Sequence, residues 1–193
     1  MAIIGVTTKP GSEPLTVNEV KRHLGQDEGI TDDEGRFSQL IEGARKRVER
    51  TTNRRLIEQT LAIYFDFFPA GFVIELPVAP VSAIASVQYY DVDGSLQTFA
   101  ASKYFTDIIN EPGRIVLKSG ESWESTEIGR SNAVVINVTA GYGDSSANVP
   151  EGIVTAMLMM IEKAFDRPDE NYLKALDRVQ INELSPYQLR RFR

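Results

Sequence analysis

The chain has 193 residues, of which 42% are hydrophobic and 25% charged, and its 27 acidic against 21 basic side chains give a formal net charge of −6. This is the composition of an ordinary globular protein, and the acidic balance argues against a protein that coats nucleic acid through bulk positive charge. Cysteine is absent and there is one histidine. Disulfides, cysteine nucleophiles and zinc sites built from Cys and His are therefore excluded.

The first part of the chain predicts two capped helices joined by a short loop. Thr16 and Glu19 form a T-x-x-E capping box ahead of an apolar stripe that stops near Gly25. The same spacing recurs at Thr31 and Glu34, which are expected to open a longer helix. The apolar residues of this second helix share one face and are Phe37, Leu40, Ile41, Ala44 and Val48.

After the second helix the hydrophobic period changes to two, and β-branched and aromatic residues predominate. These patterns predict a meander of short antiparallel strands at 60–67, 72–76, 81–90, 97–99, 104–109, 115–117 and 134–138. The first two strands are expected to form a hairpin across Pro69 to Gly71. Asp93 and Gly94 predict a second hairpin, because both residues accept the positive φ that such turns require.

A helical period returns after Pro150, which is expected at the first helical position. This third helix is apolar over more than half its circumference, so we expect it to be buried centrally and to end before Pro168. One short helix around 172–179 and then the tail 185–193 complete the chain. No segment resembles a signal peptide or a membrane span, and we expect a protein with no membrane partner.

The order helix, helix, sheet, helix predicts an α+β fold. We expect a helical bundle of two N-terminal helices plus a C-terminal helix, with an inserted antiparallel β-meander lobe and an extended C-terminal tail. The predicted parts are 1–58 and 145–168 for the bundle, 59–144 for the β lobe and 169–193 for a docking tail.

No pattern in the chain predicts a catalytic residue, a metal ligand or a cofactor site. Asp91, Asp93 and Gly94 lack EF-hand spacing and are expected to form a hairpin turn. The G-x-G at Gly141 lacks the third glycine of a dinucleotide fingerprint. The sequence places no serine or acid partner for His23, so we expect an ordinary helix-surface or half-buried histidine.

Two arginine-rich segments remain as candidate interaction sites. The first is the end of the second predicted helix, where basic residues suit the helix dipole or form a basic surface facing a subunit or nucleic acid: Arg45, Arg47, Arg50, Arg54 and Arg55. The second is the tail, where aromatic, aliphatic and basic residues alternate: Tyr187, Leu189, Arg190, Arg191, Phe192 and Arg193. Tyrosine and arginine are enriched at interface hot spots, so the tail is either a disordered end or a segment that orders on a partner.

The ordered series of motifs in the chain resembles the head-tail connector, or adaptor, proteins of tailed phages. The motifs that carry the resemblance are L-T-V-N-E-V-K-R-H-L at 15–24, I-E-G-A-R at 41–45, V-E-R-T-T-N-R at 48–54, L-P-V-A-P-V at 76–81, Y-Y-D-V-D-G at 89–94, P-G-R-I at 112–115, V-T-A-G-Y-G at 138–143 and V-P-E at 149–151. The resemblance covers the chain from about Leu15 to Phe165.

This resemblance implies a structural protein without catalysis or cofactor, assembled in the bacterial cytoplasm into the neck of a virion. It implies a twelve-subunit ring that joins the portal to the next neck or stopper protein, with DNA passing through the channel without specific binding. The tail residues named above then become candidate portal-docking residues. Two other hypotheses stay open: a small DNA-binding or processing factor that uses the patch from Arg45 to Arg55, and a dimeric binding module.

Overall fold

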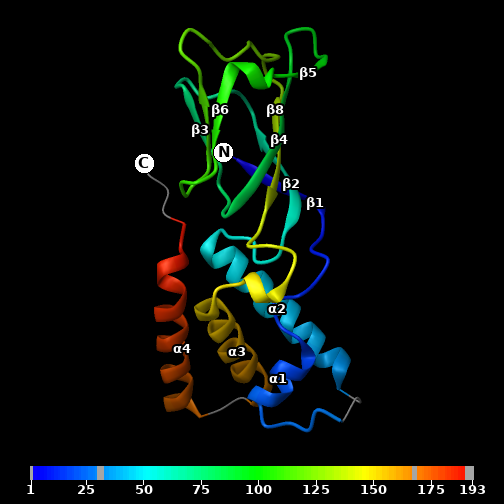
Figure 1. Cartoon of the computed structure of the whole chain (residues 1–193), viewed down its shortest axis with the longest axis vertical. Coiled ribbons are helices and arrows are strands. Elements are labelled where there is room, and N and C mark those ends of the chain that lie inside the picture. The colour runs from blue at the N-terminus through cyan, green and yellow to red at the C-terminus, as the bar shows by residue number, and fades with distance from the viewer. Residues whose placement is uncertain (1, 30–32, 167–168, 190–193) are drawn as a thin grey trace. The chain divides into compact units, whose positions relative to one another are not determined.

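The computed structural model describes residues 2–29, 33–166 and 169–189, which fold as an α+β protein (Figure 1). The chain divides into two compact units. A β unit comprises residues 2–9, 58–141 and 189, and a helical unit comprises residues 10–57 and 142–188. Among the described residues, no helix has the length and apolar character needed to cross a membrane.

The two N-terminal helices begin and end at recognisable signals. Helix α1 (Val17–His23) has the predicted capping box, with the Thr16 hydroxyl accepting from the Glu19 amide and the Glu19 carboxylate accepting from the Thr16 amide. Helix α2 (Glu34–Thr52) has Asp33 as its N-cap, and the predicted cap residue Thr31 lies outside the described residues. Helix α2 ends at Asn53, whose left-handed φ of 56° stops the chain from continuing as a helix.

Helix α3 (Glu151–Asp166) contacts the other three helices, and Figure 1 shows it between α4 and the pair α1 and α2. Pro150 immediately precedes the helix, and its carbonyl accepts from the amides of Ile153 and Val154. Met157 is fully buried on α3, in agreement with the prediction of a central apolar helix. The helical core is the contact layer among these helices and includes Val20, Phe37, Ile41, Val48, Leu56, Ile153, Met157, Ile161 and Leu184.

Helix α4 (Glu170–Leu184) is longer than the short helix predicted around 172–179. Asp169 caps it by accepting from the amides of Asn171 and Tyr172, and it packs on α3. A further short helical turn follows at Ser185–Tyr187. The stretch from Asp169 to Tyr187 is therefore an ordered part of the helical unit and not an extended tail, because its apolar face has α3 to pack against.

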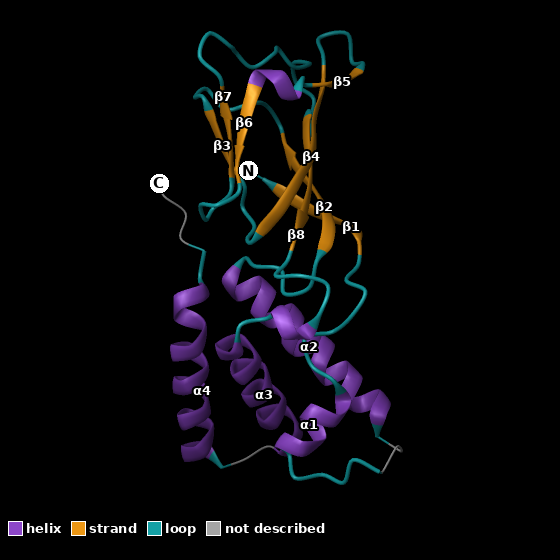
Figure 2. Ribbon diagram, viewed as in Figure 1, coloured by secondary structure: helices purple, strands orange, loops and turns teal. Residues whose placement is uncertain are grey.

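The β unit contains two antiparallel sheets (Figure 2). The five-stranded sheet has the order β1-β2-β8-β4-β5, and the three-stranded sheet has the order β3-β7-β6. The strands of the first sheet are β1 (Ile3–Thr8), β2 (Gln59–Phe65), β4 (Val81–Tyr90), β5 (Leu96–Thr98) and β8 (Val134–Ala140). Those of the second are β3 (Val73–Glu75), β6 (Tyr104–Asp107) and β7 (Arg114–Leu117).

The predicted meander is only partly right. The β4–β5 and β6–β7 hairpins are present, with Tyr90 opposite Leu96 and Asp107 opposite Arg114. The predicted hairpin of 60–67 with 72–76 is wrong, because β2 already pairs on both edges, with β1 and β8, and β3 pairs with β7 in the other sheet. Strand β1 also corrects the prediction that the residues before α1 belong to the helical part.

The core of the β unit lies between the two sheets and is apolar. Leu61 and Ile136 from the five-stranded sheet are fully buried with Ile115 from the three-stranded sheet. One end of this core is aromatic, with Phe68 stacked on Trp123 at 4.9 Å between ring centroids. The Trp123 indole also donates to the Gly71 carbonyl at 2.7 Å, which fixes the irregular loop that the sequence shows around the single tryptophan.

Candidate assembly sites

The five predicted arginines do not form one basic surface in this fold. Arg45 and Arg54 are each only 7% exposed. Arg47 and Arg50 are exposed, and Arg55 is half-buried. Burial lowers the pKa of Arg55, although the negative charge of Glu49 acts in the opposite direction. The patch is reduced to two outward-facing arginines, because Arg45 and Arg54 bind partners within the chain and Arg55 is half-buried.

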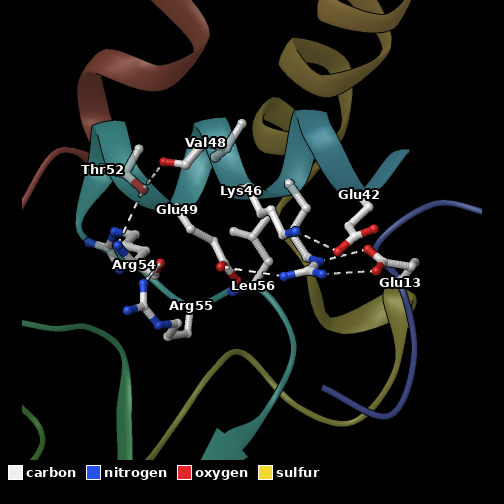
Figure 3. Close-up of polar contacts among 10 residues, drawn as sticks. Glu13, Glu42, Lys46, Val48, Glu49, Thr52, Arg54, Arg55 and Leu56 are labelled. Atoms are coloured by element: carbon white, nitrogen blue, oxygen red, sulfur yellow. Dashed lines mark hydrogen bonds and ion pairs between the residues drawn. The ribbon is translucent and has the colours of Figure 1, made fainter. Parts of the chain in front are cut away.

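Arg45 is the centre of a largely buried ion-pair network, and Figure 3 labels its partners Glu13 and Glu49. Its Nε lies 2.7 Å from Glu13 Oε2 and its Nη2 lies 3.0 Å from Glu13 Oε1, a bidentate pair. On the other side, its Nη1 lies 3.5 Å from a Glu49 carboxylate oxygen. Burial alone would lower the pKa of Arg45, but the hydrogen bond and charge of Glu13, with the charge of Glu49, raise it above its ordinary value.

The same network holds two loops against α2. Glu13 belongs to the segment that precedes α1, and the Glu49 carboxylate accepts from the amide of Leu56, in the segment that follows α2, at 3.1 Å. Both segments are thus fixed to one helix through Arg45 and Glu49 (Figure 3). The function of this charge cluster is positional, and none of its members is placed to perform chemistry on a bound molecule.

Arg54 holds the end of the described C-terminal region. Its Nε donates to the Tyr187 carbonyl at 2.6 Å, and its guanidinium lies 5.8 Å from the centre of the Tyr142 ring. Tyr187 is half-buried and packs on the helical core. A Cβ added to Gly152 would come within 3.3 Å of the Tyr187 ring, so a glycine permits this close approach. Tyr187 is therefore ordered within the chain itself, and neither alternative predicted for the tail, a disordered end or a segment that orders on a partner, applies to this residue.

The rest of the predicted docking segment is described only as far as Leu189, which is half-buried. Arg190, Arg191, Phe192 and Arg193 lie outside the described residues.

One polar cluster was not predicted from the sequence. His23 Nε2 lies 2.9 Å from Glu162 Oε2, and the Tyr172 hydroxyl donates to Glu162 Oε1 at 2.5 Å. The three residues come from α1, α3 and α4, so the cluster connects three helices. Within the described residues, no group of three or more His, Asp and Glu side chains could hold a metal ion.

Asp91 forms the hairpin turn that its spacing predicts. Its Oδ1 accepts from the amides of Asp93 and Ser95 at 3.0 and 2.9 Å, and Gly94 has a φ of 76°. The hydrogen bond from Gln97, followed by those from the Ser95 and Asp93 amides, lowers the pKa of Asp91. This carboxylate is occupied by its own turn and is not a calcium ligand set.

The β unit has an open, largely apolar cleft of about 170 Å³. It lies where β2 ends and β3 begins, and it is lined by Phe65, Asp66, Phe67, Pro69, Val73, Ile74 and Glu75. Phe67 remains 68% exposed beside it. No local pattern in the sequence indicates this cleft, because its two walls belong to strands of different sheets.

Neither a protein-family model nor a curated protein matches the chain. Solved structures do match it over its whole length. A chain from the neck of an empty GTA particle, computed with C6 symmetry, has a TM-score of 0.80 and 20% sequence identity, with 99% of this chain and 97% of that chain aligned.

Two further structures match with the same coverage, 99% of this chain and 97% of the other. One is the virion of a native gene transfer agent (GTA) particle, at a TM-score of 0.75 and 20% identity. The other is the neck of a native GTA particle computed with C12 symmetry, at a TM-score of 0.73 and 22% identity. The chain therefore has the fold of chains in these particles, and the predicted resemblance to head-tail connectors is confirmed at the level of the fold.

Proposed function

We propose that this chain is a structural adaptor in the neck of a tailed phage or of a phage-like particle such as a gene transfer agent. The observation that carries the proposal is the likeness to a GTA neck chain at a TM-score of 0.80, over 99% of this chain and 97% of the other. Both units are included in that alignment, so the likeness is to a whole subunit. The adaptor works by contact and shape, without catalysis or a cofactor.

In this proposal the subunits form a ring, of twelve copies in the particle, that joins the portal to the next neck or stopper protein. The C6 and C12 symmetry of the neck structures that contain similar chains supports a ring. Ring symmetry repeats each subunit contact, so individually weak contacts add up. A net charge of −6 suits a channel through which DNA passes without specific binding.

The C-terminal segment from Tyr187 to Arg193 is the proposed portal-docking segment. Arg54 holds the Tyr187 carbonyl, which fixes the start of this segment on the helical unit. Arg47 and Arg50, exposed on α2, are the remaining candidates for a contact between subunits. The alternative of a DNA-binding factor loses support, because Arg45 and Arg54 are already engaged inside the protein.

Deletion of the gene from the particle-producing cell tests this function. We expect DNA-filled heads without attached tails, and restoration of complete particles by the intact chain supplied in trans. Electron microscopy of purified particles gives the count of tailed and tailless heads. Particles that mature normally without the chain would exclude the adaptor role, and a purified chain that binds DNA with a steep salt dependence would favour the alternative.

A further inference from the structure

The cleft beside β3 lies at two unpaired edges of the β unit. Strand β3 is the outer strand of its sheet and pairs only with β7. In the described register, β1 pairs with β2 only as far as Ile3 opposite Tyr64, so Phe65 and the residues after it extend beyond β1. An unpaired strand edge next to an apolar hollow is a surface suited to an extended peptide.

The cleft combines an apolar floor with negative charge. Asp66 and Glu75 are its only charged lining residues among those described, and both are acids. Asp66 accepts from the Asn132 amide at 3.0 Å, whereas no described residue pairs with the exposed Glu75 carboxylate. Phe67 and Phe72, 68% and 70% exposed, flank the site. A complementary ligand is an aromatic or aliphatic side chain flanked by cations.

The chain itself carries a segment of that composition. Its last five residues are Leu189, Arg190, Arg191, Phe192 and Arg193, which provide one aromatic ring, three cations and no acidic side chain. A cavity of about 150 Å³ is large enough for benzene, so the cleft of about 170 Å³ can hold one phenyl ring. We propose that the cleft of one copy binds the C-terminal segment 189–193 of a second copy.

A contact of this type is heterologous, since a tail on one copy meets a cleft on the next, and heterologous contacts form a ring when the rotation between successive copies closes. The choice of a second copy therefore rests on the proposed ring. The inference also goes beyond that function, because the same segment is the proposed portal-docking segment. A tail held in a neighbouring cleft is not available to the portal, so portal and cleft compete for it and docking exchanges one contact for the other.

Photocrosslinking of the full-length chain tests the contact without the portal. Phe192 is replaced by the photoreactive analogue p-benzoylphenylalanine, and equal amounts of unlabelled and ¹⁵N-labelled chains are mixed before irradiation. We expect crosslinks from position 192 to the peptide that contains residues 65–75, and we expect pairs of mixed isotopic composition. Crosslinks only within one chain, or to other parts of the protein, would overturn the proposal.

A charge reversal with a matched control tests the chemistry. Glu75→Lys is expected to lower the yield of the mixed crosslink by about three- to ten-fold, because it replaces an attraction to the arginines by a repulsion. Asp93→Lys makes the same change in net charge at an exposed turn outside the cleft and is expected to leave the yield unchanged. Equal yields from the two variants, both with unaltered circular dichroism, would contradict a charge-selective cleft.

A peptide competition separates the contribution of the Phe192 phenyl ring to binding from the contribution of the arginine charges. The peptide Ser185–Arg193 is expected to suppress the mixed crosslink, and the same peptide with Phe192→Ala to need about ten-fold more for equal suppression, since it lacks the buried ring. Equal potency of the two peptides would show that the cleft does not receive the ring. None of these measurements involves the portal, so negative results would not contradict the adaptor role. Conversely, if the adaptor role were excluded, the crosslinking experiment would still test the contact between cleft and tail by itself.

Discussion

The helical unit and the β unit differ in where they place charged and apolar side chains. Among the described residues, six polar or charged side chains are buried, and the β unit contributes one of them, Gln59. The other five belong to the helical unit and are Lys21, Arg45, Glu49, Thr52 and Arg54. Conversely, eleven of the fourteen exposed large hydrophobic side chains lie in the β unit, and the other three, Tyr172, Val179 and Ile181, lie on α4.

This difference has a physical meaning. A small helical core has long loops to fix, and buried ion pairs such as Arg45 with Glu13 fix them at the cost of desolvation. Two packed sheets fix their own strands through backbone hydrogen bonds, so the β core can be wholly apolar. Its surface is then free to carry exposed apolar side chains, which mark a contact site only where they form a contiguous patch.

The largest expected effect on stability comes from a substitution in the β core. Ile136→Ala removes a fully buried side chain between the sheets and is expected to cost about 4 kcal/mol of unfolding free energy. Ile109→Ala removes the same atoms from a side chain that is 94% exposed and is expected to change stability little. Urea denaturation of the two variants gives the comparison. Similar losses from both would refute the assignment of Ile136 to the core.

The next effect tests the charges of the helical unit. Arg45→Met leaves the carboxylates of Glu49 and Glu13 without their shared cation, and we expect a loss of about 2–3 kcal/mol. That value lies below the usual range for fully buried pairs because the Glu13 side chain is 34% exposed. Lys46→Met is the control on the same helix, since its ion pair with Glu42 is exposed and is expected to contribute less than about 1 kcal/mol.

A local measurement decides whether Arg45 also positions the two loops. The Leu56 amide donates a hydrogen bond to the Glu49 carboxylate. Hydrogen exchange at this amide is expected to become faster in Arg45→Met than in Lys46→Met. An unchanged Leu56 amide in both variants would restrict Arg45 to a purely global contribution.

A smaller effect concerns the cluster that connects α1, α3 and α4. Glu162→Gln keeps the shape of the side chain but removes the charge that accepts from His23 and Tyr172. We expect a loss of about 1 kcal/mol, seen as faster hydrogen exchange in α4 while the exchange of α2 is unchanged. Glu170→Gln, at an exposed pair with Lys174 on α4 itself, serves as the control. Equal effects of the two substitutions would contradict a role of the cluster in holding α4.

Local signals in the sequence predicted the features whose partners lie a few residues apart. The capping box of Thr16 and Glu19 and the turn at Asp93 and Gly94 depend on such short distances, and both are present. The apolar face of α2 was likewise predictable, because its period depends on one helix alone.

The remaining features depend on partners far along the chain. Strand β8 lies between β2 and β4, with Leu61 opposite Val138, and no local pattern indicates that pairing. The arginines at the end of the second predicted helix indicated a basic surface because their acceptors, Glu13 for Arg45 and the Tyr187 carbonyl for Arg54, are distant in sequence. His23 lacked an acid partner for the same reason, since Glu162 belongs to the third helix.

The smallest effect is a pH dependence at the surface of the β unit, where charges act only on their own turn. The hydrogen bond from Gln97, then those from the Ser95 and Asp93 amides, lower the pKa of Asp91. A lowered pKa in the folded state means that Asp91 stabilises the fold above the ordinary carboxyl pKa of about 3.9. This stabilisation is lost as the pH falls from there through the lower, folded value.

Carbonyl-detected NMR titration of Asp91 measures this pKa directly. Gln97→Ala removes the largest cause of the shift, so the pKa of Asp91 is expected to rise toward its ordinary value while the two amide hydrogen bonds keep part of the shift. Asp91→Asn should remove the pH dependence of the β4–β5 hairpin amides and leave their chemical shifts near those of the unaltered protein at neutral pH. If Gln97→Ala left the pKa of Asp91 in place, the turn amides alone would hold the carboxylate, and the side-chain contact between the two strands would have no electrostatic role.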